Sequence, residues 1–190
     1  MELGYAKHVP TFVNATDSGK NVTIYKNIRY GNPPIGNLRF RKPDTKLPRQ
    51  DGIQDGHVPW RSRSCISTVP AGAPFPDING TTWGHEDCLF LDVYVPKGVK
   101  PGDKVPVLHM FHGSAYTFLD KEATDFFNPI GLFDGSEEEN TFIFVMNNYR
   151  LVHPVKKPGS LLAILTIRKS GYAGVDLRPW ARHGRQRRSS

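Results

Sequence analysis

The residues best suited to chemistry form a tight turn, His112-Gly113-Ser114-Ala115-Tyr116, which follows an apolar run from Val105 to Phe111. A turn of small residues that leaves a buried strand presents backbone N–H groups to an oxygen on which negative charge develops. The amides of Ser114 and Ala115 would supply these groups, and Gly113 would allow the turn. If the backbone requires positive φ there, Ser and Ala would be strained. The alternative is a strand-ending turn without chemistry.

Three other groups of residues offer chemistry. Glu86 and Asp87 are a carboxylate pair of the kind that acid–base catalysis uses. His109 and His112 are three residues apart, so on a strand they point to opposite faces and cannot share a metal ion. We expect His109 to be a buried strand residue. Trp60 and Trp83 would either line a substrate gorge or pack against loop backbone.

The two cysteines, Cys65 and Cys88, leave three alternatives, which are buried thiols, part of a metal site or a disulfide. A metal site would need further ligands at tight spacing, such as C-x-x-C, and the sequence lacks them. A bridge would contribute about 3 kcal/mol in the chain-entropy description. The glycosylation sequons at Asn14, Asn21 and Asn79, taken with a disulfide, favour the secretory pathway.

The positions of these residues depend on the strands that precede them. Residues 22–30 alternate apolar and polar side chains, which is typical of a half-buried strand. Near-continuous apolar runs at 89–95, 105–111 and 141–146 indicate strands buried on both faces, as in a helix-covered parallel sheet. Residues 37–85 are predicted to be mostly irregular, and residues 120–140 to be a solvated loop with a short helix at most.

The net charge of +7 is concentrated at one end of the chain. Residues 161–190 contain seven arginines and lysines against Asp176 alone, and the first 160 residues are nearly neutral. A neutral body and a basic tail without a recognised module argue against a nucleic-acid partner. No stretch approaches the roughly 20 apolar residues of a membrane span, and no leader is recognisable after Met1.

Five segments, in the same order, resemble the type-B carboxylesterase/lipase family over residues 3–153. Residues 86–94, EDCLFLDVY, closely resemble the signature E-D-C-L-x-L-N-[VI]-Y, with Asp92 in the place of Asn. The other four are residues 25–43, similar to GIPYAxPPxGxLRFxxP, Cys65 as the expected disulfide partner of Cys88, residues 106–116, similar to PVxVxxHGGGF, and residues 145–151, similar to VxxNYRLG.

This resemblance implies a partial α/β-hydrolase fold, consisting of the N-terminal strands and the oxyanion-turn region, with an incomplete sheet. A disordered basic tail would occupy 154–190. It also implies an oxyanion hole at Gly113, Ser114 and Ala115, a Cys65–Cys88 disulfide, and a structural Glu86 paired with Arg39 or Arg150. The expected activity is that of a secreted hydrolase acting on a small-molecule ester, with neither a cofactor nor a metal.

The nucleophile of the family is a Ser in Gly-x-Ser-x-Gly, and no Ser in this sequence has Gly two residues before it. After Leu151 the residues Val152-His153-Pro154 depart from the family pattern. We therefore expect a chain truncated before the catalytic serine and inactive as given. The alternative is a non-catalytic binding or adhesion protein on the same fold, as in the neuroligins. Neither interpretation determines an oligomeric state.

Overall fold

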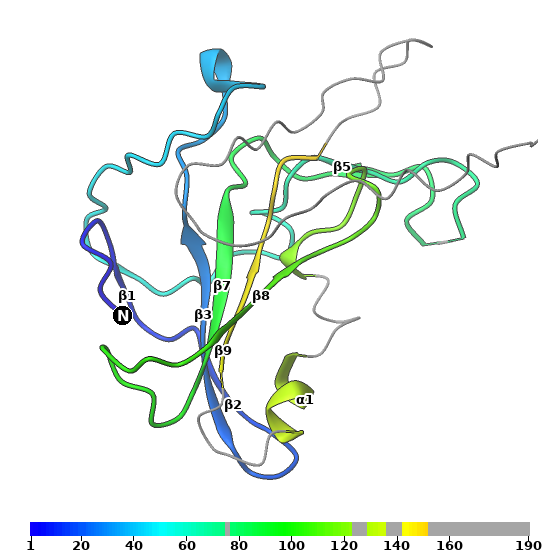
Figure 1. The fold of residues 1–190 in the computed structure, drawn as a ribbon. Helices are drawn as coiled ribbons and strands as arrows, with labels where there is room; N and C mark the ends of the chain where they lie inside the picture. The colour runs from blue at the N-terminus through cyan, green and yellow to red at the C-terminus, as the bar shows by residue number, and fades with distance from the viewer. Residues whose placement is uncertain (75–76, 123–128, 136–141, 152–190) are drawn as a thin grey trace, which may run out of the picture. The chain divides into compact units, whose positions relative to one another are not determined.

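The computed structural model describes residues 1–74, 77–122, 129–135 and 142–151, all within one unit of the chain, Met1–Ser160. Its centre is a five-stranded sheet in the order β2-β3-β7-β9-β8 (Figure 1). The strands are β2 Phe12–Ala15, β3 Asn21–Arg29, β7 Phe90–Pro96, β8 Val107–Phe111 and β9 Ile143–Asn147. The smaller elements are β1 Lys7–His8, η1 Gly36–Leu38, β4 Ile53–Gln54, β5 Ser67–Thr68, β6 Thr82–Trp83 and α1 Pro129–Asp134.

The sheet is mixed, so the prediction of a parallel sheet was wrong for most of its strands. β2 pairs with β3, β3 with β7 and β7 with β9 in antiparallel fashion, and β8 pairs with β9 in parallel. Residues 16–20 join β2 to β3, and so short a connection allows a hairpin but no parallel crossover. All four predicted strands are present with small shifts at their ends, whereas β2 was not predicted.

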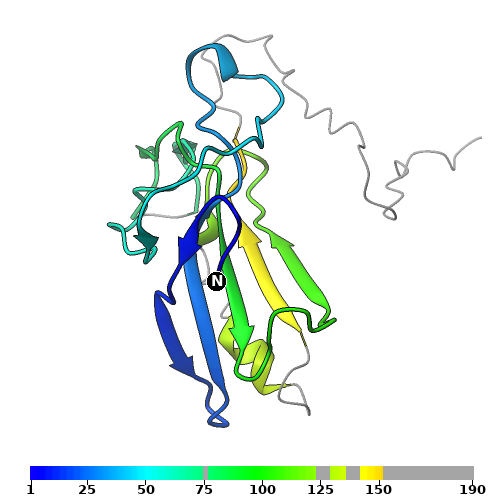
Figure 2. The same ribbon diagram turned by 90° about the vertical axis from the view of Figure 1, so that its left-hand side faces the viewer.

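The main hydrophobic core lies between the sheet and α1. Alternate residues of the strands point to the same face, and Val22, Ile24, Tyr94, Phe144 and Met146 are buried there with Phe133 of α1. Among the described residues of 120–140, α1 is a short helix as predicted, but Asp120, Lys121 and Phe133 are buried, so the prediction of a solvated loop was wrong there. The acidic residues at 137–139 lie outside the described residues. Figure 2 shows the strands side by side, with α1 against one face near the β2–β3 turn.

The strand β8 is exposed, which contradicts the prediction that it is buried on both faces. Val107 is 59% exposed and Phe111 is 61% exposed, and His109 is exposed as well rather than buried. Among the strands that the structure describes, β8 stands at the edge of the sheet and pairs with β9. An apolar run identifies a strand, but the run by itself does not say how many neighbours cover that strand.

A disulfide between Cys65 and Cys88 braces the long connection that precedes β7. Both cysteines are buried with Leu89, and Tyr30 and Leu151 pack against them. This finding decides between the three alternatives that the sequence left open. The described residues of 37–85 contain the end of η1 and three two-residue strand segments and are otherwise irregular, as predicted.

The two carboxylates before Cys88 form ion pairs with arginines. Glu86 pairs with Arg39, whose Nη2 lies 2.7 Å from Glu86 Oε2, so of the two predicted partners Arg39 is the one found. Asp87 accepts two hydrogen bonds from Arg29, at 2.6 and 2.8 Å, and Arg63 lies 3.5 Å away. These carboxylates connect the irregular layer to β3, as the structural interpretation requires.

The β2–β3 turn is fastened to the end of α1 by Asp134. One carboxylate oxygen of Asp134 accepts hydrogen bonds from the backbone N–H of Ser18 at 3.1 Å and from its hydroxyl at 2.6 Å, and the other accepts one from Asp17 N–H at 3.1 Å. Hydrogen bonds from the side chains of Ser18 and Thr16 favour the charged form and lower the pKa of Asp134 to about 2.

These hydrogen bonds to Asp134 predict that the folded chain loses stability in acid. The pKa of Asp134 lies below the value of about 3.9 for an unfolded Asp, so its stabilising contribution is complete above about pH 4 and is lost as the pH falls toward 2. In thermal unfolding, Asp134→Asn should lower the melting temperature at pH 5, and the difference from the parent should shrink by pH 2. Asp103→Asn, which changes another exposed carboxylate, is the control. A difference that does not vary with pH would contradict the assignment.

Candidate functional site

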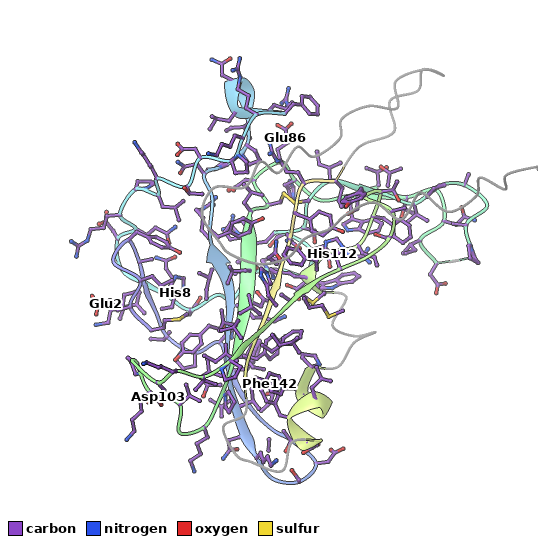
Figure 3. All side chains as sticks on the ribbon, in the orientation of Figure 1. Glu2, His8, Glu86, Asp103, His112 and Phe142 are labelled. Atoms are coloured by element: carbon purple, nitrogen blue, oxygen red, sulfur yellow. A yellow bond between two sulfur atoms is a disulfide. The ribbon has the colours of Figure 1, made fainter. Side chains whose placement is uncertain are left out.

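The turn after β8 lies beside the residues that follow β9. β8 and β9 are parallel and end together, with Phe111 opposite Asn147. The chain therefore leaves both strands at the same end of the sheet, where His112 is buried (Figure 3). This register brings residues 112–119 against Asn148 and Tyr149, although more than 25 positions separate them along the chain.

The backbone of this turn is left-handed at three successive residues. The φ values are 80° at Ser114, 52° at Ala115 and 59° at Tyr116. The positive φ that would strain Ser and Ala is thus present, at a cost on the order of 1–3 kcal/mol for each such residue. A turn in this conformation persists only if its surroundings hold it.

The carbonyl groups of Gly113 and Ser114 accept hydrogen bonds, whereas the amides of the turn have no acceptor among the described residues. Ser114 Oγ lies within hydrogen-bonding reach of the carbonyl oxygens of Gly113 and Phe118. Ser114 O accepts hydrogen bonds from Thr117 N–H at 3.1 Å and from Thr117 Oγ1 at 2.8 Å. Within the described part of the chain, no acceptor faces the backbone N–H groups of residues 113–116. These amides are therefore available to an external oxygen.

Tyr149 holds the start of the turn. Its hydroxyl donates to the carbonyl oxygen of His112 and lies 3.3 Å from that of Gly113. Its ring stacks on His112 with centroids 4.3 Å apart, and Tyr116 meets it edge-on at 5.8 Å. Burial, and then the neighbouring Tyr116, raise the pKa of Tyr149, so the hydroxyl keeps the proton that it donates. Burial lowers the pKa of His112, which favours the neutral imidazole.

Asn148 holds the end of the turn. Its side-chain oxygen accepts a 2.7 Å hydrogen bond from Lys121 N–H, and its side-chain nitrogen donates to Arg63 O at 2.7 Å. Its own backbone N–H donates to Phe90 O at 2.9 Å. One buried amide therefore ties residues 118–122 to β7 and to the layer braced by the disulfide.

A network of buried charged side chains also fixes residues 118–122. Lys121 and Asp92 are both fully buried, and Lys121 Nζ lies 3.0 Å from Asp92 Oδ1 and 2.6 Å from Glu122 Oε1. Lys26 Nζ approaches Glu122 Oε2 at 2.7 Å, and Asn27 N–H donates to Asp92 at 2.8 Å. Burial alone would lower the pKa of Lys121, but the carboxylates of Asp92 and Glu122 outweigh burial and raise it. Lys121 therefore stays charged.

The remaining candidates lie outside this arrangement. His109 Nε2 contacts Asn147 Oδ1 at 2.8 Å, and the described residues contain no cluster of His, Cys, Asp or Glu that could hold a metal ion. Trp60 and Trp83 enclose the guanidinium of Arg61, with its carbon 3.9 and 4.1 Å from the ring centroids. The described residues also contain no helix long and apolar enough to cross a membrane.

Sequence reasoning missed the residues that position the turn. Lys121 lies in a stretch that looked solvated, and Tyr149 was noted only as part of a motif. One signal was present, because Asp92 stands where the family signature has Asn. A charge that replaces an amide inside a strand implies a buried partner of opposite charge.

Comparison with known proteins identifies relatives over most of the chain. The profile of the Carboxylesterase family matches residues 11–153. Acetylcholinesterase 1 of Caenorhabditis elegans is 34% identical over 72% of this chain, and Carboxylesterase patB of Penicillium expansum is 31% identical over 80% of it. The chain spans 21% and 33% of the lengths of these two relatives.

Solved structures show the same local fold. EstA of Aspergillus niger superposes with a TM-score of 0.56 at 27% identity, covering 78% of this chain and 25% of that protein. Juvenile hormone esterase of Manduca sexta superposes with a TM-score of 0.58 at 23% identity, covering 74% and 24%, and supports the fold alone. The described residues are therefore a partial esterase-like fold, made mostly of strands.

The role of Tyr149 can be tested by measurements of stability and of amide hydrogen exchange, which require no catalytic activity. Tyr149→Phe keeps the ring stack but removes the hydroxyl that binds the carbonyls before the turn, so we expect a loss of about 1 kcal/mol in unfolding free energy. Amide hydrogen exchange at residues 113–117 should also become faster. Tyr116→Phe is the matched control, because no described residue pairs with its hydroxyl. Equal effects of the two substitutions would contradict the assignment.

The buried pair predicts strong coupling between two substitutions. Lys121→Met leaves Asp92 buried without its nearest cation and should cost about 3–5 kcal/mol in urea unfolding. Asp92→Asn combined with Lys121→Met removes both charges and should recover most of that loss. Lys104→Met, at an exposed lysine, should change little. Additive losses in the double variant would show that the two residues do not act as a pair.

Proposed function

Because the chain belongs to the Carboxylesterase family, we propose that it forms the oxyanion-binding part of a hydrolase that acts on small-molecule carboxylic esters. One observation carries this proposal, which is the turn at 113–116, where the carbonyls of Gly113 and Ser114 accept hydrogen bonds and the amides have no acceptor among the described residues. A turn that merely ended a strand would have no reason to keep three successive left-handed residues without glycine.

The chemistry follows from where charge develops. Attack on an ester carbonyl produces a tetrahedral intermediate whose oxygen is negative, and preorganised N–H groups stabilise this oxygen without rearranging. The amides of Ser114 and Ala115 would donate to it, with the exposed Gly113 leaving room for the substrate. Losing one such donor typically lowers kcat by roughly 10²–10³-fold.

The nucleophile and the general base would come from polypeptide beyond these 190 residues. Gly-x-Ser-x-Gly does not occur in the sequence, and in the described segments no serine hydroxyl is hydrogen-bonded to a histidine. Ser114 points its hydroxyl at carbonyl oxygens, and Ser64 donates to Asp120 at 2.6 Å. We therefore propose that these 190 residues hydrolyse no ester on their own.

The second candidate function is that of a non-catalytic binding protein on the same fold. A binding protein on this fold would need no nucleophile. The unpaired amides disfavour it, because they have a use in catalysis and none is evident in adhesion. Grafting the segment into an active relative separates the two functions.

The experiment compares the isolated chain with a graft. We expect no hydrolysis of p-nitrophenyl butyrate by the 190-residue chain. We expect hydrolysis when residues 11–153 replace the aligned segment of Aspergillus niger EstA. In that graft Ala115→Pro should lower kcat by roughly 10²-fold or more, because Pro has no N–H and its φ is fixed near −65°.

Ala115→Gly is the matched control, because Gly keeps the N–H and accepts the observed φ of 52°. This variant of the graft should retain its activity. Each graft variant is compared with its parent only if both unfold cooperatively at the same melting temperature. Two results would overturn the proposal, namely turnover by the isolated chain or an Ala115→Pro graft as active as its parent.

A further inference from the structure

The loop closed by the disulfide carries a sequon on its outer surface. Asn79-Gly80-Thr81 lies between β5 and β6, within the stretch that Cys65 and Cys88 bracket. Asn79 and Gly80 belong to a turn that begins at Asp77, and both Asn79 and Thr81 are exposed. Asn followed by Gly suits such a turn, because Gly80 has a φ of 71° and no neighbouring atom where a Cβ would lie.

The two ends of the Asn79 amide face different surroundings. Its oxygen accepts a 2.8 Å hydrogen bond from Gly72 N–H, and only an oxygen can accept from a backbone amide, so the orientation of the group is settled. Its nitrogen faces no acceptor among the described residues. A substituent on the nitrogen would therefore leave the hydrogen bond to Gly72 intact and extend into solvent.

The other two sequons have poorer surroundings. Asn21 is half-buried on β3, and its carbonyl accepts a hydrogen bond from Lys97 N–H at 2.8 Å. Asn14 is exposed on β2, but the hydroxyl-bearing residue of its sequon, Thr16, is buried and bonded to Lys20 N–H at 3.0 Å. Both are strand residues, whereas an occupied sequon is expected on a surface loop.

The bond between Cys65 and Cys88 adds independent information, because disulfides persist mainly in oxidising compartments such as the secretory pathway. We infer that the chain passes through the secretory pathway and carries one N-linked oligosaccharide, on Asn79. This inference does not depend on ester hydrolysis.

The modification is a glycosyl transfer from a lipid-linked oligosaccharyl diphosphate. The Nδ2 nitrogen of Asn79 forms a bond to the anomeric carbon of the first sugar, and the bond from that carbon to the diphosphate oxygen breaks. The lipid diphosphate leaves with the bonding electrons, and one amide proton passes to a base of the transferase. No oxidation or reduction occurs, and Asn79 Oδ1 remains an acceptor for Gly72 N–H.

The test translates the full 190-residue chain behind a cleavable secretion leader in the presence of endoplasmic-reticulum microsomes. A single species shifted in mass and sensitive to peptide-N-glycosidase is expected. Asn79→Gln and Thr81→Ala should each abolish the shift, whereas Thr81→Ser should keep it because a Ser hydroxyl also completes the sequon. Asn14→Gln and Asn21→Gln are the matched controls and should keep the shift.

Release of the glycan in ¹⁸O-labelled water converts the carrier Asn to labelled Asp, and peptide mass spectrometry then locates it. Label at Asn79 alone is the expected result. Label at Asn14 or Asn21, a shift that survives Asn79→Gln, or an unshifted parent chain would each overturn the inference.

Discussion

The side-chain amide of Asn148 and the ion pair of Lys121 with Asp92 are the contacts on which the turn depends. The turn itself is strained, because three residues with side chains adopt positive φ. Its intrinsic preference would be to relax and pair its amides internally. Anchors on both sides prevent this, since Tyr149 holds the carbonyls before the turn and the buried pair fixes the segment after it.

The buried pair of Lys121 and Asp92 combines a desolvation cost with a gain in positional specificity. Two charges removed from water cost several kcal/mol each unless their partners are complete. Here Lys121 meets two carboxylates, and Asp92 also accepts from Asn27 N–H, which β3 exposes at an irregularity in its pairing with β7. An apolar contact of equal volume would hold residues 118–122 as firmly, but it would allow them to shift along the sheet. The paired charges therefore favour a single position of residues 118–122.

The sequence predicted the elements that depend on local pattern and on recognisable motifs. The four strands, the disulfide and the pairing of Glu86 with one of two arginines, found to be Arg39, belong to this group. It did not predict strand direction or the exposure of β8, because these depend on which strands become neighbours. Lys121 was missed for a related reason, since a lysine in a polar stretch becomes buried only through a contact formed far away in sequence.

The anchors described for the turn lie within the first 151 residues, and this bears on how an active site could be assembled. They come from β3, from β7, from the residues that follow β9 and from the layer braced by the disulfide. The strained conformation therefore requires no nucleophile, base or substrate to form. Preorganised donors cost no rearrangement at the moment of reaction. Under the proposed function, oxyanion binding and nucleophilic attack would therefore be built by separate parts of the fold, with the donors in place first.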